Sequence, residues 1–135
     1  MKKVLVTGIS GFIGHQCAVE LLKNGYSVKG TVRDLGKKDE VINGIKKEID
    51  PVENLEFVNL DLLNDKGWDD AMKDCKYVLH VASPFFMKEP SNEDEYIKPA
   101  CEGTIRVLKA AQKAKIKRIV LTSSVVSMTG KIYDS

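Results

Sequence analysis

Short runs of apolar and β-branched residues alternate along the chain with longer stretches in which apolar residues recur every three or four positions. The short runs predict β-strands and the longer stretches predict helices. The predicted strands cover residues 4–6, 27–32, 55–60, 77–82 and 118–122. The predicted helices cover residues 12–24, 38–49, 68–75 and 92–114.

Helices that separate successive strands predict right-handed βαβ crossovers and therefore a parallel sheet. The first predicted strand is a continuous apolar run, and the fourth and fifth nearly are, which is typical of strands covered on both faces. We expect a doubly wound α/β sheet with strand order 3-2-1-4-5. The length of 135 residues suits one such unit.

A glycine-rich segment joins the first predicted strand to the first predicted helix. It reads TGISGFIG over residues 7–14. In this strand-to-helix setting, T-G-x-x-G-x-x-G is typical of a dinucleotide-binding turn, whose glycines allow a tight turn, close approach to a pyrophosphate and close helix packing. A connecting turn without a ligand is the alternative. The candidate cofactor-binding residues are Thr7, Gly8, Ser10, Gly11, Phe12, Ile13 and Gly14.

Residues 1–135 are therefore predicted to form an NAD(P)-binding Rossmann domain, and the end of the second strand indicates which cofactor it takes. The sequence there is GTVRD, residues 30–34. The Arg33 guanidinium suits a 2′-phosphate, and Lys37 would add a second contact, so NADP (NADPH) is favoured over NAD. Two alternatives stay open: Asp34 would serve a ribose hydroxyl of NAD, and a lysine-rich loop is often only solvated surface.

Composition excludes several other classes of function. The chain has 21 basic and 19 acidic residues, a net charge of +2, which does not predict binding to nucleic acid or to an anionic membrane. The cysteines, Cys17, Cys75 and Cys101, lie in no C-x-x-C or metal-ligand spacing, so we predict reduced, buried thiols and no metal site. No window approaches the roughly 20 apolar residues of a membrane helix, and an intracellular, cytoplasmic protein is expected.

Six segments spread along the chain give a more specific signal than the glycine loop alone. They are VTGISGFIG (6–14), GTVRD (30–34), DL (61–62), VLHVASP (78–84), IKPACEGT (97–104) and LTSS (121–124). Together and in this order they resemble the extended short-chain dehydrogenase/reductase family, in particular its dihydroflavonol reductase and cinnamoyl-CoA reductase-like branch. The resemblance implies the nucleotide-binding part of an NADP-dependent oxidoreductase that reduces a small aldehyde or ketone.

The resemblance also assigns roles to residues after the later strands. It implies that Asp61 and Leu62 hold the adenine. It implies that Val81, Ala82, Ser83 and Pro84 lie along the pyrophosphate and nicotinamide ribose. It implies that Ser124 is the catalytic serine, whose hydroxyl hydrogen-bonds the substrate carbonyl.

The chain departs from the family pattern in its tyrosines. Such enzymes use a tyrosine as proton donor and a lysine four residues later, but the tyrosines at positions 26, 77, 96 and 133 are not followed by lysine at that spacing. We therefore expect a fragment, truncated before a sixth strand and inactive alone. A stand-alone NADP-binding or redox-sensing module is an alternative, and so is a nucleotide-sugar epimerase or dehydratase, against which Arg33 argues.

Two further expectations concern single features of the sheet. Without a sixth strand, the fifth would leave an apolar edge exposed, and such edges favour self-association between chains. His80 lies in an apolar strand pattern and is predicted to be a packed, hydrogen-bonded core histidine rather than a catalytic base.

Overall fold

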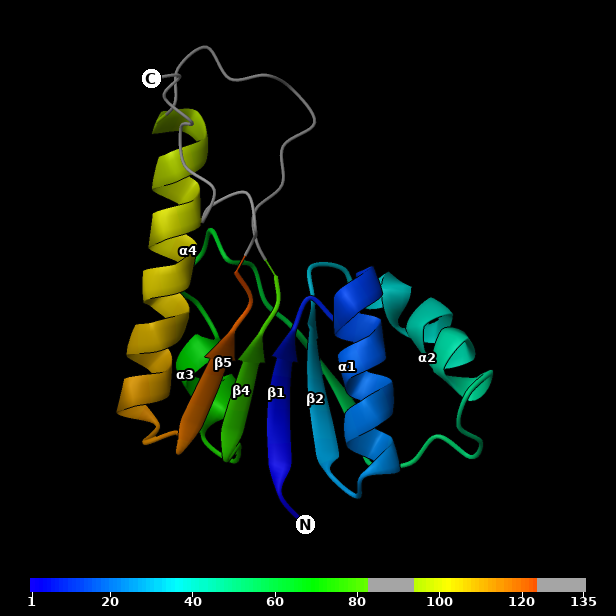
Figure 1. Ribbon diagram of the computed structural model, residues 1–135. Helices are drawn as coiled ribbons and strands as arrows, with labels where there is room; N and C mark the ends of the chain where they lie inside the picture. The colour runs from blue at the N-terminus through cyan, green and yellow to red at the C-terminus, as the bar shows by residue number, and fades with distance from the viewer. Residues whose placement is uncertain (83–93, 124–135) are drawn as a thin grey trace, which may run out of the picture.

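The computed structural model describes residues 1–82 and 94–123, and each predicted strand and helix is present in it (Figure 1). The strands are β1 (Lys3–Thr7), β2 (Ser27–Val32), β3 (Leu55–Asn59), β4 (Tyr77–His80) and β5 (Arg118–Leu121). The helices are α1 (Phe12–Lys23), α2 (Lys38–Lys46), α3 (Trp68–Met72) and α4 (Asp94–Lys113), with a short 3₁₀ turn, η1 (Leu35–Lys37), before α2.

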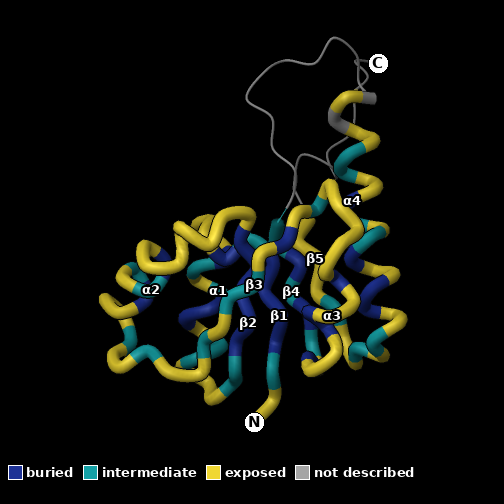
Figure 2. Tube along the Cα trace, turned by 180° about the vertical axis from the view of Figure 1, so that it is seen from behind, coloured by how far each residue is buried: buried dark blue, intermediate teal, exposed yellow. Residues whose placement is uncertain are grey.

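The five strands form a parallel sheet in the order β3-β2-β1-β4-β5, which confirms the predicted fold and strand order. Helices α1 and α2 lie on one face, and α3 and α4 on the other (Figures 1 and 2). Val4 and Val6 of β1 pack in the core beneath α1 and α2, whereas Leu5 between them packs in the core beneath α3 and α4. Because side chains alternate along a strand, a strand covered on both faces needs apolar residues at every position.

Strand β5 is less buried than its sequence predicts. Ile119 packs against the core beneath α4, but Val120 and Leu121 are 51% and 48% exposed. The expectation of cover on both faces is therefore wrong for β5. The reason is its place at the edge of the described sheet, where β4 is its neighbour on one side.

Several elements end earlier than their sequence pattern. Helix α2 stops at Lys46, because the N–H groups of Lys47 and Glu48 bond to carbonyls three residues back and tighten the turn. Strand β4 stops at His80, because the next two N–H groups bond to a side chain of β1 rather than to a neighbouring strand.

The prediction of buried thiols is right for Cys75 and wrong for Cys101, which is exposed on α4.

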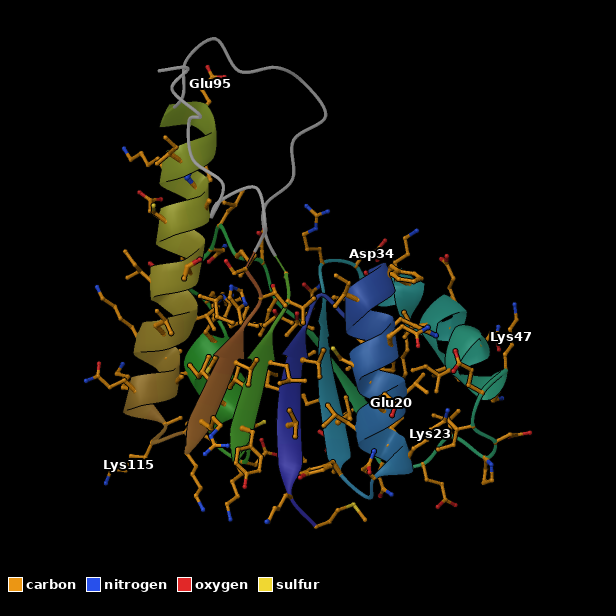
Figure 3. The ribbon with its side chains drawn as sticks, viewed as in Figure 1. Glu20, Lys23, Asp34, Lys47, Glu95 and Lys115 are labelled. Carbon is orange, nitrogen blue, oxygen red and sulfur yellow. The ribbon has the colours of Figure 1, made fainter. Side chains whose placement is uncertain are left out.

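The two ends of the sheet carry different residues. The glycine loop and the turn that contains Asp34 lie at the carboxyl ends of the strands, while Lys23 and Lys115 lie toward the opposite end (Figure 3). The carboxyl ends of β1 and β4 matter most, because the chain leaves β1 toward α1 on one face and leaves β4 toward α4 on the other. Ligands of doubly wound sheets bind at such switch points.

Candidate functional site

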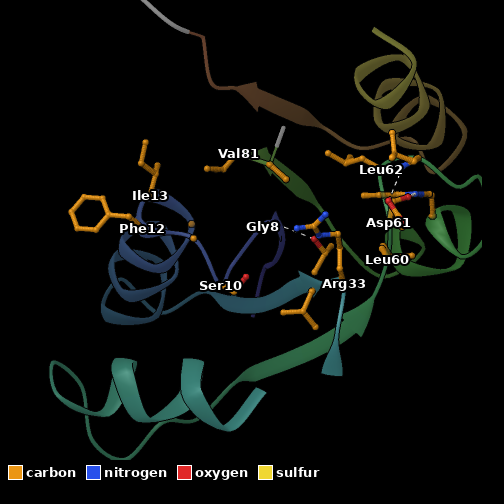
Figure 4. A pocket seen from close by; sticks show the side chains of 16 residues that line it. Gly8, Ser10, Phe12, Ile13, Arg33, Leu60, Asp61, Leu62 and Val81 are labelled. Carbon is orange, nitrogen blue, oxygen red and sulfur yellow. Dashed lines mark hydrogen bonds between the residues drawn. The ribbon is translucent and has the colours of Figure 1, made fainter. Parts of the chain in front are cut away.

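A cleft of about 500 Å³ opens at the carboxyl ends of β1, β2 and β4. Residues of the loop that follows β3 form part of its wall. Figure 4 shows its side chains around one hollow, with Phe12 and Ile13 of α1 on one side and Asp61 and Leu62 on the other. The structure brings these predicted residues together in its wall: Gly8, Ser10, Gly11, Phe12, Ile13, Gly14, Arg33, Asp61, Leu62, Val81 and Ala82. Residues far apart in sequence thus meet where the fold predicts a ligand.

The glycine loop is held in a shape that larger residues would prevent. Gly8 has a φ of +68°, and a Cβ built on it would lie 3.0 Å from the Cβ of Ala82. A Cβ on Gly14 would lie 2.1 Å from the carbonyl oxygen of Gly8, so a side chain there would collide with backbone. The loop therefore lies close to both α1 and the end of β4, and backbone rather than side chains forms this part of the cleft wall.

The N-terminus of α1 is suited to an anion. Gly11 caps this helix without a side-chain hydrogen bond, and the first turn contains no acidic residue. The first N–H groups of a helix have no partners within it, and they carry the positive end of the helix dipole. Because Phe12, Ile13 and Gly14 line the cleft, these N–H groups are available to a pyrophosphate there.

Thr7 lies behind the cleft rather than in its lining. Its side chain is fully buried, and its Oγ1 accepts hydrogen bonds from the N–H groups of Val81 and Ala82, each at 2.9 Å. The same oxygen lies 2.9 Å from Nδ1 of His80. His80 is 3% exposed, which confirms the prediction of a packed, hydrogen-bonded core histidine, and burial lowers its pKa.

Arg33 and Asp34 are adjacent but differently engaged. Arg33 is exposed and lines the cleft, and within residues 1–82 and 94–123 no hydrogen bond or ion pair occupies its guanidinium. The Asp34 carboxylate accepts a hydrogen bond from the Gly36 N–H at 2.8 Å and caps η1. Lys37 lies outside this cleft, in an adjoining hollow of about 310 Å³ that shares Ser10, Gly11 and Phe12 with it. The Lys37 ammonium lies 3.5 Å from the Glu40 carboxylate.

The loop after β3 is shaped by two residues that sequence reasoning missed. Trp68 Nε1 donates to the carbonyl oxygens of Asp61 and Asn64, at 3.1 and 3.0 Å, and the indole lines the cleft. The Arg106 guanidinium of α4 bonds to the Leu62 carbonyl and to Asp65. Trp68 could have been noticed in the sequence because it is the one tryptophan and begins a predicted helix. Nothing in the sequence indicates the role of Arg106.

Three predicted site residues lie outside the described residues, namely Ser83, Pro84 and the candidate catalytic Ser124. In the part of the chain that is described, no group of three or more histidine, cysteine or acidic side chains is placed to hold a metal ion. None of the described helices is both long and apolar enough to cross a membrane.

Almost the whole chain matches a known protein family. Residues 4–134 match the model of the NAD dependent epimerase/dehydratase family. The chain belongs to this family. Its fold, with the cleft at the switch between β1 and β4, is consistent with a dinucleotide-binding member of an epimerase/dehydratase family.

The relatives of this chain include proteins that are named as reductases. Tetraketide alpha-pyrone reductase 1 of Arabidopsis thaliana is 41% identical over 133 residues, which cover 98% of the chain and 40% of that protein. The bifunctional dihydroflavonol 4-reductase/flavanone 4-reductase of Malus domestica is 38% identical over 125 residues, 91% of the chain and 35% of that protein. These matches confirm the resemblance to the dihydroflavonol reductase-like branch. The chain spans less than half of the length of these relatives.

Solved structures agree with this placement. The chain is similar to the structure of yeast methylglyoxal/isovaleraldehyde reductase Gre2 complexed with NADPH. The TM-score is 0.75 and the sequence identity is 30%. The match covers 90% of the chain and 37% of that reductase. It confirms the predicted Rossmann-type fold.

Proposed function

We propose that this chain binds NADPH and forms the nucleotide-binding part of a reductase that acts on an aldehyde or ketone. The observation that carries the proposal is the contrast between Arg33 and Asp34. The Arg33 guanidinium lines the cleft, and no described partner occupies it, whereas the Asp34 carboxylate caps η1 and does not line the cleft. The side chain that suits a 2′-phosphate is thus presented, and the one that suits a ribose hydroxyl is engaged in a turn.

Physical chemistry favours NADPH at such a site. A guanidinium makes charge-assisted, paired hydrogen bonds to a phosphate, and these are stronger than bonds between neutral groups. With NADPH bound, the N–H groups at the start of α1, beside Gly11, would hold the pyrophosphate. Lys37, in the adjoining hollow, would add a second positive charge near the 2′-phosphate by leaving its exposed pair with Glu40. Exposed pairs of this kind contribute little, so the exchange costs little.

The names of relatives support a carbonyl substrate. The Gre2 structure is named for methylglyoxal and isovaleraldehyde and holds NADPH. The two curated relatives are named as a tetraketide alpha-pyrone reductase and a dihydroflavonol 4-reductase/flavanone 4-reductase. In this reading Ser124 hydrogen-bonds the carbonyl oxygen. Proton donation would fall to a tyrosine with a lysine four residues later, a pair that the 135 residues do not contain. We propose that these residues alone bind NADPH and turn over no substrate.

Titration of the fluorescence of Trp68 tests the cofactor proposal. Trp68 is the one tryptophan of the sequence and lines the cleft, so bound NADPH should quench its emission. We expect NADPH to bind at least about tenfold more tightly than NADH, and Arg33→Gln to weaken NADPH at least about tenfold without affecting NADH. Arg118→Gln is the matched control. It removes the same charge from an exposed arginine at the opposite end of the sheet, and should leave both affinities unchanged. An unchanged NADPH/NADH ratio in Arg33→Gln would refute the proposal.

A stand-alone NADPH-binding or redox-sensing module, which would need no catalytic tyrosine, is the second candidate. It predicts NADPH binding with no turnover of generic aldehydes, as the reductase proposal does for these residues alone. The two candidates differ in the gene. A reading frame that continues into Tyr-x-x-x-Lys supports the reductase, and one that ends at residue 135 supports the module.

A further inference from the structure

Thr7 and His80 are the last paired residues of β1 and β4. They lie opposite each other in the parallel register, at the point where the two strands separate and the cleft begins. Their side chains lie 2.9 Å apart, from Thr7 Oγ1 to His80 Nδ1, and the two residues are 0% and 3% exposed. A buried polar contact behind the cleft therefore connects β1 and β4, whose ends carry parts of the cleft wall.

The hydrogen bonds of Thr7 determine which atom donates in this contact. A threonine hydroxyl has one proton to donate and two lone pairs to accept. Both lone pairs are occupied, because the N–H groups of Val81 and Ala82 each donate to Oγ1 at 2.9 Å. The hydroxyl proton is therefore donated to His80. Nδ1 of His80 is an acceptor without a proton, and the neutral ring carries its proton on Nε2.

From this geometry we infer that His80 is a positioning residue for the cofactor cleft. It accepts the Thr7 hydroxyl proton, and this turns both lone pairs of Oγ1 toward Val81 and Ala82. Those residues form the cleft wall that faces the glycine loop. The inference rests on the proposed function, since the bound ligand is taken to be NADPH.

The space between the two walls shows why this orientation matters. Ala82 approaches Gly8 so closely that a Cβ on Gly8 would lie 3.0 Å from the Cβ of Ala82. The last described backbone bond from β5 to β4 runs from the Thr122 N–H to the His80 carbonyl, so the two bonds to Thr7 Oγ1 hold the N–H groups of the next two residues. Without an acceptor at His80, the buried hydroxyl would turn its proton toward another partner. One of the two N–H groups would then lose its acceptor on Thr7 Oγ1, and Ala82 would shift. Burial lowers the pKa of His80, which favours the neutral ring that the acceptor role requires.

Two substitutions at His80 separate positioning from packing. His80→Asn places an amide oxygen about where Nδ1 lies, which keeps the acceptor but loses the ring. His80→Phe keeps a ring and loses the acceptor. If His80 only fills space, Phe should be the milder change. If it positions Thr7, we expect Phe to weaken NADPH binding about tenfold and Asn to weaken it less than about threefold. Equal or reversed effects on affinity would overturn the inference.

Measurements without cofactor keep this test separate from the proposed function. In the unliganded chain, ¹⁵N NMR should show Nδ1 of His80 without a proton, and a protonated Nδ1 would overturn the inference. Hydrogen exchange at the Val81 and Ala82 amides should accelerate at least about tenfold in His80→Phe but not in His80→Asn. If the unmodified chain shows these features yet does not bind NADPH, the proposed function fails and the positioning role stands. Thr7→Val, which removes the hydroxyl at nearly constant shape, should accelerate the same two amides if His80→Phe does not fold.

Discussion

Gly14 lies against the carbonyl oxygen of Gly8 so closely that a Cβ on Gly14 would sit 2.1 Å from that oxygen. The neighbouring atoms are backbone, including the Gly8 carbonyl carbon and the Ile9 Cα, at 2.8 and 3.1 Å. No side-chain rotation can relieve such a collision, so α1 would have to move away from β1.

We predict that Gly14→Ala lowers the free energy of unfolding by about 2–3 kcal/mol and abolishes measurable NADPH binding. Urea unfolding and the Trp68 titration check these two outcomes. Gly11→Ala is the control for stability, since a Cβ there meets the Gly8 oxygen at 3.4 Å, an ordinary contact. Equal stability losses in the two variants would contradict the packing argument.

Gly30 of β2 has a different neighbour, the side chain of Ile9. A Cβ on Gly30 would lie 2.5 to 2.9 Å from Cδ1, Cγ2 and Cβ of the fully buried Ile9. Gly30→Ala should therefore destabilise the fold by about 1–3 kcal/mol. Because Ile9→Ala removes two of the three colliding atoms, the double variant should be more stable than the sum of the two single losses predicts. A thermal or urea double-mutant cycle measures this coupling, and strict additivity would count against it.

Asp74 connects two lysines at the amino end of the sheet. Its carboxylate accepts from Lys29 Nζ at 2.5 Å and from Lys3 Nζ at 2.7 Å. Burial opposes ionisation of Asp74, but the hydrogen bonds from the lysines outweigh it and lower the pKa from 3.8 to about 2. The unfolded chain thus takes up a proton near pH 4 and the folded chain only near pH 2. Stability from this group is complete above about pH 4 and is lost as the pH falls toward 2.

We predict that Asp74→Asn lowers the free energy of unfolding at pH 7 by about 1 kcal/mol, a modest value because the carboxylate is half exposed and solvent screens the pair. It should also remove part of the loss of stability between pH 4 and pH 2. Urea unfolding over this range makes the measurement. Asp70→Asn, in an exposed pair with Lys73, is the control and should leave stability nearly unchanged. If Asp70→Asn and Asp74→Asn behave alike, the role of Asp74 is refuted.

The edge of the sheet at β5 yields a prediction on assembly. We propose that a second copy of the chain pairs along β5, which lies at an edge of the described sheet with β4 as its inner neighbour, and where Val120 is 51% exposed. Sedimentation should show association that grows with concentration, and Val120→Lys should weaken it, since charges on an edge strand oppose pairing. Leu35→Lys, at an equally exposed residue of η1, should not change it. A monomer at high concentration would refute the proposal.

Periodicity predicted most of the fold because it is a local property. The alternation of apolar runs with helical stretches indicated the order β3-β2-β1-β4-β5, and the TGISGFIG segment located the cleft before any contact was known. Lengths were predicted less well. Strand β4 ends at His80 rather than at residue 82, because a side chain from β1 takes the N–H groups that a ladder would have used.

Individual roles within the site depended on contacts between distant parts of the chain. The sequence assigned Thr7 to the cofactor, but folding buries it against His80, 73 residues away. It left Arg33 and Asp34 as open alternatives, and only folding shows that Arg33 lines the cleft while Asp34 accepts from the Gly36 N–H. It gave no sign that Arg106 holds the loop of Leu62. Spacing along a chain encodes which elements form and how they succeed one another, whereas the direction and partners of a polar side chain depend on which distant groups packing brings within hydrogen-bonding distance.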